Sequence, residues 1–166
     1  MDTTRVLVGL DGSEAARRAF RVAIEEALWR QATVCALHVV FVPMVMGRTL
    51  SFEIAENVID YGNLVMDREL DLLRDEYGGE FPVEVERRVR SGHIGRELVV
   101  ATSDRDLGIE LVVVGTRGLG GFTSLVLGSV STYAIQHLDV PVLVVPDLPE
   151  SSSDEAAREV FELVDL

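Results

Sequence analysis

The sequence predicts an α/β domain built on an open, parallel, five-stranded sheet with helices on both faces. Short apolar runs alternate with stretches in which apolar residues recur at helical spacing, a pattern typical of such sheets. With 166 residues, of which 48% are hydrophobic, the chain is long enough for one domain with a substantial core.

The strands are expected at residues 5–10, 33–40, 82–89, 110–114 and 140–145. Ser13 fits the N-cap of the first helix, whose apolar face holds Ala16, Phe20, Ala23, Ile24 and Ala27. The later helices are expected at residues 51–77, ending before two glycines, from 92 to about 101, and at 129–137. Pro141 favours an edge position for the last strand, because proline cannot donate a ladder hydrogen bond.

The composition excludes several classes of function. A formal net charge of −13 argues against binding nucleic acid through its phosphates. The sequence contains no lysine, which rules out a Walker A loop and Schiff-base chemistry. Because no apolar run approaches about 18 residues and the N-terminus lacks signal-peptide features, we expect a cytoplasmic protein without a membrane span. Cys35, the single cysteine, is expected to be a buried structural thiol.

The C-terminal segment differs in composition from the rest. Residues 147–166 carry seven Asp or Glu and one Arg. We therefore divide the chain into a domain at 1–146 and an acidic extension at 147–166, which either forms a frayed helix or stays disordered.

A glycine-rich segment, GTRGLGGFTSLVLGSVS, begins at Gly115, directly after the fourth expected strand. Glycines allow backbone N–H groups to surround a phosphate without lysine, and a helix N-terminus adds unpaired amides and partial positive charge. Gly128 and Ser129 stand where the last helix begins, so their amides and the hydroxyls of Ser129 and Ser131 could face an anion. Arg117 is the one cation of the segment. Remaining phosphate charge would require a divalent ion such as Mg²⁺.

Structural explanations remain open for these residues. The glycines could serve turn geometry alone, and Thr123 interrupts the dinucleotide-binding spacing G-x-G-x-x-G. Asp11 either contacts a nucleotide or satisfies nearby turn amides, and Ser129 could simply cap its helix. Met44 and Met46 could cover an adenine or pack against the second helix. Three scattered histidines lack metal-ligand spacing, so no metal site is expected among them.

The spacing of these motifs resembles the universal stress protein family. Gly115-x-x-Gly118 is followed after nine residues by Gly128-Ser129, which is similar to that family's nucleotide-binding signature. The similarity extends over nearly the whole chain to Val145. It implies a Rossmann-like fold of the adenine nucleotide alpha hydrolase type, with five parallel strands and four helices.

The resemblance also implies roles for individual residues. It places Asp11 beside the nucleotide, Val39 against adenine through its backbone, and Gly115 and Gly118 along the ribose and phosphates. It assigns phosphate contacts to the segment Gly128, Ser129, Val130 and Ser131. It further implies an edge-to-edge homodimer through the last strand, from Val142 to Val145.

We therefore expect a dimeric, ATP-binding regulator of stress tolerance that acts on a partner protein as yet unknown. No general base or nucleophile stands out, so no catalytic residue is assigned, and any ATP hydrolysis or autophosphorylation should be slow. Two alternatives stay open. One is an ATPase or adenylyl-transfer enzyme on the same fold, and the other is a dimeric scaffold without a nucleotide.

Overall fold

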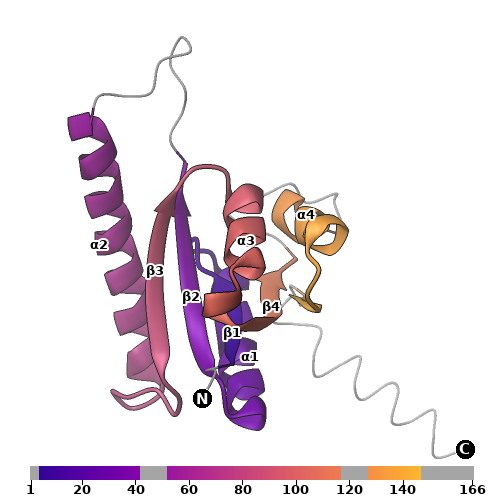
Figure 1. Ribbon diagram of the computed structural model, residues 1–166. Helices are drawn as coiled ribbons and strands as arrows, with labels where there is room; N and C mark the ends of the chain where they lie inside the picture. The colour runs from indigo at the N-terminus through magenta and orange to yellow at the C-terminus, as the bar shows by residue number, and fades with distance from the viewer. Residues whose placement is uncertain (1–3, 42–51, 117–126, 147–166) are drawn as a thin grey trace, which may run out of the picture.

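The computed structural model describes residues 4–41, 52–116 and 127–146. Its strands and helices alternate along the chain and form one parallel sheet in the order β3-β2-β1-β4-β5 (Figure 1). The elements are β1 (Arg5–Gly9), α1 (Glu14–Arg30), β2 (Thr33–Val40), α2 (Phe52–Glu76), β3 (Val85–Ser91), α3 (Ile94–Ser103), a 3₁₀ turn (Arg105–Leu107), β4 (Ile109–Gly115), α4 (Ser129–His137) and β5 (Val142–Val145). The predicted fold class is confirmed.

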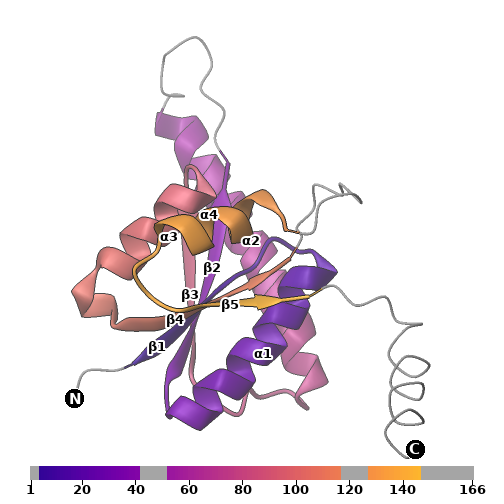
Figure 2. The same cartoon turned by 90° about the vertical axis from the view of Figure 1, so that its right-hand side faces the viewer.

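Helices cover both faces of this sheet. Figure 1 looks onto β3, with α2 on one side of the sheet and α3 and α4 on the other, and Figure 2 shows α3 and α4 from the front. One core lies between the sheet and the pair α1 and α2, where Phe20 and Leu73 are completely buried. The second core lies under α3 and α4 around Leu7, Leu98 and Val112.

The first helix forms as its sequence predicts. The Ser13 hydroxyl accepts a hydrogen bond from the amide of Ala16 at 3.2 Å, which satisfies one unpaired donor of the first turn. All five residues predicted for its apolar face are buried. The helix ends at Arg30, and its C-cap residue Gln31 adopts the left-handed conformation with φ 55°.

Two strands begin later than predicted, at Val85 and at Val142, and proline is involved in both cases. Residues 82–84 precede β3, although the carbonyl of Glu84 already accepts from the amide of Val34 at 2.9 Å. Pro141 precedes β5 and contributes only its carbonyl, which accepts from Val112 at 3.0 Å. The predicted edge position of the last strand is confirmed.

Several expectations fall on residues that the structure does not describe. These are the Met44 and Met46 lid, the positions of Arg117 and Gly118, and the conformation of the acidic extension at 147–166. Within the described ranges, no helix has the length and apolar character needed to cross a membrane.

Candidate functional site

The carboxyl ends of β1, β2 and β4 lie side by side at one edge of the sheet. β1 is central, with β2 on one side and β4 on the other, so the chain changes direction across the sheet at β1. Such a switch point opens a crevice beyond the strand ends, where ligands of open α/β sheets bind. Asp11 follows β1, Val39 is the last residue but one of β2, and Gly115 ends β4. Gly128 directly precedes α4.

The turn after β1 is held by its own side chains. The carboxylate Oδ1 of Asp11 accepts a hydrogen bond from the amide of Ser13 at 2.9 Å. Gly12 has a φ of +85°, a backbone conformation that favours glycine. Asp11 therefore satisfies a turn amide, as one of its two interpretations predicts. The residue is half-buried at the strand end.

The two ends of the glycine-rich segment are tied together. The amide of Gly128 donates to the carbonyl of Thr116 at 2.6 Å, and the amide of Thr116 donates to the carbonyl of Val145 at 2.9 Å. A single hydrogen bond therefore joins the residue after β4 to the residue before α4. Arg117 and Gly118 lie inside this segment, beyond the described residues.

The N-terminus of α4 has no capping side chain. Gly128 is the N-cap residue, so the expectation that Ser129 caps this helix is wrong, because Ser129 is already the first helical residue. The first amide with an intrahelical partner is that of Thr132, which donates to the carbonyl of Gly128 at 3.0 Å. The amides of the three preceding residues thus lack helical carbonyl partners, as in every helix, and none is satisfied by a side chain at the N-cap.

The side chains of this first turn point in different directions. Ser129 is exposed, whereas Ser131 is only 1% exposed and its hydroxyl donates to the carbonyl of Gly128 at 3.0 Å. Ser131 therefore directs its hydroxyl into the protein and leaves only its amide to a ligand. Val130 packs on the core beneath α3 and α4.

On the neighbouring strand, Val39 is half-buried and packs on the same core. His38 points to the other side and contacts the carbonyl of Leu10 through Nδ1 at 2.6 Å, which is a structural role. Among the described residues no cluster of three or more His, Cys, Asp or Glu could hold a metal ion.

Sequence reasoning missed a buried carboxylate beside the Asp11 turn. Glu69 of α2 is 7% exposed, and a Cβ placed on Gly12 would lie 3.7 Å from its Oε1. Arg17 of α1 pairs with Glu69 through two hydrogen bonds of 2.8 and 3.0 Å. No sequence signal links these residues, which are 52 positions apart.

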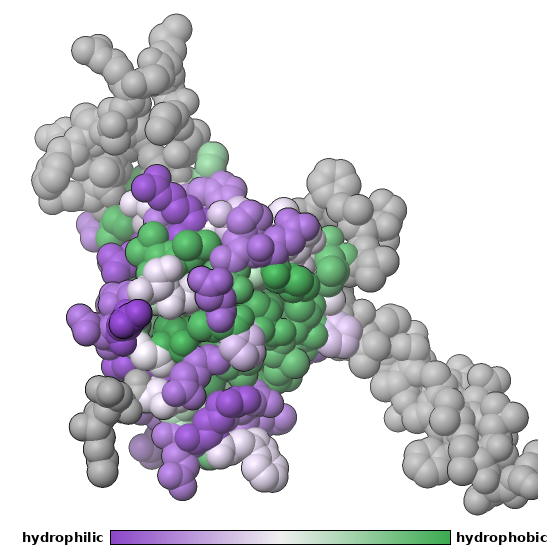
Figure 3. Space-filling model, turned by 45° about the vertical axis from the view of Figure 1, so that its right-hand side comes forward, coloured by the Kyte–Doolittle hydropathy of each residue, from purple (hydrophilic) through white to green (hydrophobic). Residues whose placement is uncertain are grey.

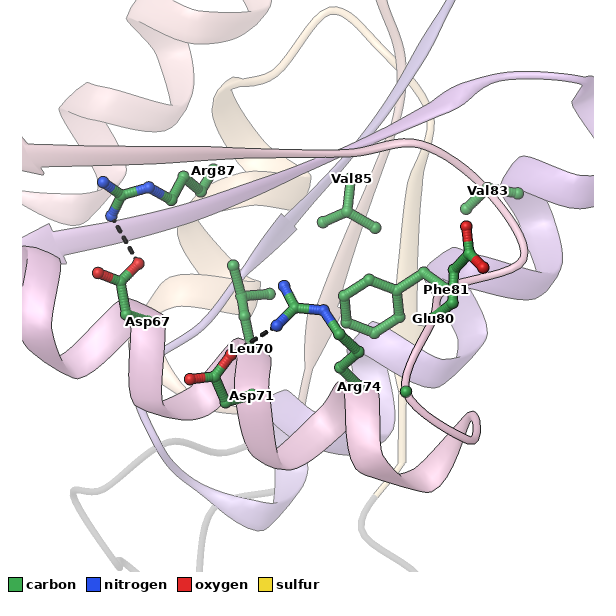
Figure 4. A pocket seen from close by; sticks show the side chains of 10 residues that line it. Asp67, Leu70, Asp71, Arg74, Glu80, Phe81, Val83, Val85 and Arg87 are labelled. Atoms are coloured by element: carbon green, nitrogen blue, oxygen red, sulfur yellow. Dashed lines mark hydrogen bonds and ion pairs between the residues drawn. The ribbon is translucent and has the colours of Figure 1, made fainter.

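A groove of about 610 Å³ lies elsewhere, between α2 and the amino-terminal half of β3. Figure 4 shows Asp67, Asp71 and Arg74 of α2 on one side and Arg87 of β3 on the other. Because the predicted residues follow the carboxyl ends of β1, β2 and β4, this groove is a separate feature.

Comparison with known proteins places the chain in a family. The model of the universal stress protein family matches residues 3–146. Universal stress protein YxiE of Bacillus subtilis is 32% identical over 146 residues, which cover 85% of this chain and 97% of that protein. Universal stress protein Rv2005c of Mycobacterium tuberculosis is 34% identical over 143 residues, which cover 84% of this chain but only 44% of the longer relative.

Solved structures share the fold. Universal stress protein UspA from Lactobacillus plantarum has a TM-score of 0.66 at 21% identity, covering 87% of this chain and 99% of that one. A universal stress protein in complex with cAMP has a TM-score of 0.61 at 24% identity, covering 87% and 98% of the two chains. The sequence matches and the shared fold agree, and this chain belongs to the universal stress protein family.

Proposed function

We propose that the protein binds an adenine nucleotide, ATP with Mg²⁺, in the crevice at the carboxyl ends of β1, β2 and β4. The observation that carries the proposal is the N-terminus of α4, which has no capping side chain. Its N-cap residue, Gly128, is hydrogen-bonded to Thr116, the residue after β4. A helix start without a capping side chain offers backbone amides and partial positive charge to an anion, and no lysine is needed for this.

Two related structures support an adenine ligand. One is the universal stress protein in complex with cAMP, and another is a universal stress protein from Archaeoglobus fulgidus in complex with dAMP. Their identity to this chain is below 25%, so they support the ligand class through a shared fold. The glycine spacing of this sequence resembles that of ATP-binding members of the family, and ATP is therefore the nucleotide that we propose.

Different residues of this chain would contact different parts of the nucleotide in the proposed complex. The amides of Ser129, Val130 and Ser131 would hold phosphate oxygens, and the backbone of Val39 would meet the adenine. Asp11, beside the same strand ends, would orient the nucleotide. Bound Mg²⁺ would supply positive charge to the phosphates, which suits a chain without lysine.

We also propose that the last strand pairs with its copy in a second subunit. Val142–Val145 is an apolar strand at one end of the sheet, and an unpaired apolar edge favours association. On the face shown in Figure 3, hydrophobic surface gathers toward α4 and β5. Ile135 of α4 is 53% exposed. Such a cytoplasmic dimer would act by binding: nucleotide would order the loops of the crevice and change the surface offered to a regulatory partner protein.

Calorimetric titration of ATP, ADP, AMP and cyclic AMP, with and without Mg²⁺, tests the proposal. We expect ATP binding in wild type and its loss in Gly118→Val, with Arg30→Ala, at the end of α1 far from the crevice, as a control. No heat with any nucleotide, after removal of copurified ligand, would leave the scaffold alternative. Rapid turnover that disappears in Asp11→Asn would favour the enzyme alternative.

A further inference from the structure

The outer edge of β3 is open in the described part of the chain. β3 lies at the end of the sheet and pairs with β2 along one side. Figure 1 looks onto this edge, with no described element in front of it. An open edge presents unpaired N–H and C=O groups that can pair with another strand.

The hydrogen bonds to β2 show which backbone groups face outward. The carbonyl of Glu84 accepts from β2, and the amide of Gly92 donates to β2, each at 2.9 Å. Because backbone groups alternate sides along a strand, the even-numbered residues face β2. Val85, Arg87 and Val89 therefore direct their N–H and C=O groups to the open edge.

The charges along this edge are divided into two halves. Glu84 and Glu86 come first, and Arg88 and Arg90 follow on the same face of the sheet, since side chains alternate between faces. The valines of the strand pack into the core on the opposite face, toward α1 and α2. If a second copy of this strand is laid alongside in the opposite direction, its arginines therefore lie opposite the glutamates of the first copy.

We propose that this edge binds the same edge of a second copy of the chain, antiparallel, about a two-fold axis at Arg87. In this register Arg87 faces its own copy, and Val85 faces Val89 of the partner subunit, all with outward backbone groups. Glu86 then lies opposite Arg88 of the partner subunit, and Glu84 opposite Arg90 of the partner subunit. These pairs fall at non-hydrogen-bonded positions, where side chains approach most closely, with Cα atoms about 4.5 Å apart.

Charge selects this register over its neighbours. A shift by one pair in one direction sets Glu86 opposite its own copy, and a shift in the other direction does the same to Arg88. Like charges directly opposite each other destabilise a strand pair. An edge protected by repulsion alone would carry one sign of charge, whereas this edge carries both signs in opposite halves.

The local contacts permit the pairing. Arg87 would meet its copy at the axis, but its Nη1 already pairs with Oδ1 of Asp67 at 2.8 Å, which offsets the like charge. Both residues line the groove beside β3 (Figure 4), so there is space for partner side chains on that face. Glu86 already pairs with Arg5 at 2.8 Å and with Arg88 at 3.4 Å within its own chain. Glu84 and Arg90 are exposed, and neither makes an ion pair within the described residues, so this outer pair is the one available to a partner.

Sedimentation velocity over a range of protein concentrations, with charge-swapped variants, tests the proposal. Arg90→Glu and Glu84→Arg should each weaken the association about tenfold or more, because two complementary pairs per dimer become repulsive. The double variant should restore it, and so should an equimolar mixture of the two single variants, in which both pairs are again complementary. Arg96→Glu, the same charge change on α3, is the matched control.

A dimer through β5 would persist in every variant, so the β3 contact would then be seen as a larger species built from such dimers. Association that is identical in wild type and Arg90→Glu would overturn the proposal. The proposal would also be overturned if association remained weak in both the double variant and the equimolar mixture of single variants. The measurement needs no nucleotide, so its result is separate from that of the titration.

Discussion

Gly115, the last residue of β4, lies against the backbone of Ala15 in the first turn of α1. A Cβ placed on Gly115 would be 2.9 Å from the carbonyl oxygen of Ala15 and 3.0 Å from its carbonyl carbon. Backbone atoms cannot move aside as a flexible side chain can, so this glycine has a packing function in addition to its proposed place in the nucleotide site.

Gly115→Ala should therefore destabilise the protein even without nucleotide. We expect a loss of about 1–3 kcal/mol in the free energy of unfolding, the usual cost of overpacking. Gly9→Ala, at the end of β1, is the control, because a Cβ there would meet no atom within 4 Å. Urea unfolding measures both, and equal losses in the two variants would contradict the assignment.

The helix caps give a second matched pair. Ser13→Ala removes the hydroxyl that accepts from Ala16, and should cost about 1 kcal/mol. Ser129→Ala should be nearly neutral in the nucleotide-free protein, since Gly128 and not Ser129 is the N-cap of α4. Thermal unfolding of the two variants distinguishes these positions. A cost at Ser129 as large as at Ser13 would argue against the α4 boundary.

The Glu69–Arg17 pair should stabilise the contact between α1 and α2. Its side chains are 9% and 29% exposed, so we expect Glu69→Ala to cost about 2 kcal/mol, less than for a fully buried pair. A double-mutant cycle with Arg17→Ala should give a coupling energy of about 1 kcal/mol or more. The exposed pair of Arg30 and Glu26 is the control, with a coupling below about 0.5 kcal/mol. A zero coupling for Glu69 and Arg17 would refute the prediction.

Cys35 gives a pH-dependent prediction. Burial raises the pKa of its thiol, and its side chain is inaccessible. The folded protein therefore retains the proton that the unfolded chain releases above about pH 8.5. The contribution to stability is fully present below that pH and is lost as the pH rises toward the folded pKa.

We expect the free energy of unfolding to fall between about pH 8.5 and 9.5 more steeply in wild type than in Cys35→Ala. Urea unfolding under reducing conditions measures the slope. The steeper slope should be accompanied by slow alkylation of the thiol in the folded protein. Parallel curves for the two proteins, or rapid alkylation, would show that the thiol is not buried as described.

The sequence by itself determined the order and type of every described strand and α-helix, but not the 3₁₀ turn at Arg105–Leu107. Periodicity and capping are local properties, so the buried face of α1, the whole of β2 and the bounds of α2 to within one residue could be predicted. Strand ends were less certain near Pro82 and Pro141, because the start of a strand depends on the partner strand that receives its hydrogen bonds.

The tertiary structure decided which residues from distant segments come into contact and in which direction their side chains point. It placed Glu69 beside the Asp11 turn, turned the Ser131 hydroxyl inward, and brought Gly115 against Ala15. It also left β3 at one end of the sheet, paired with β2 along one side. These relationships join residues far apart in the chain or depend on side-chain direction, and only the assembled sheet and its packed helices fix both.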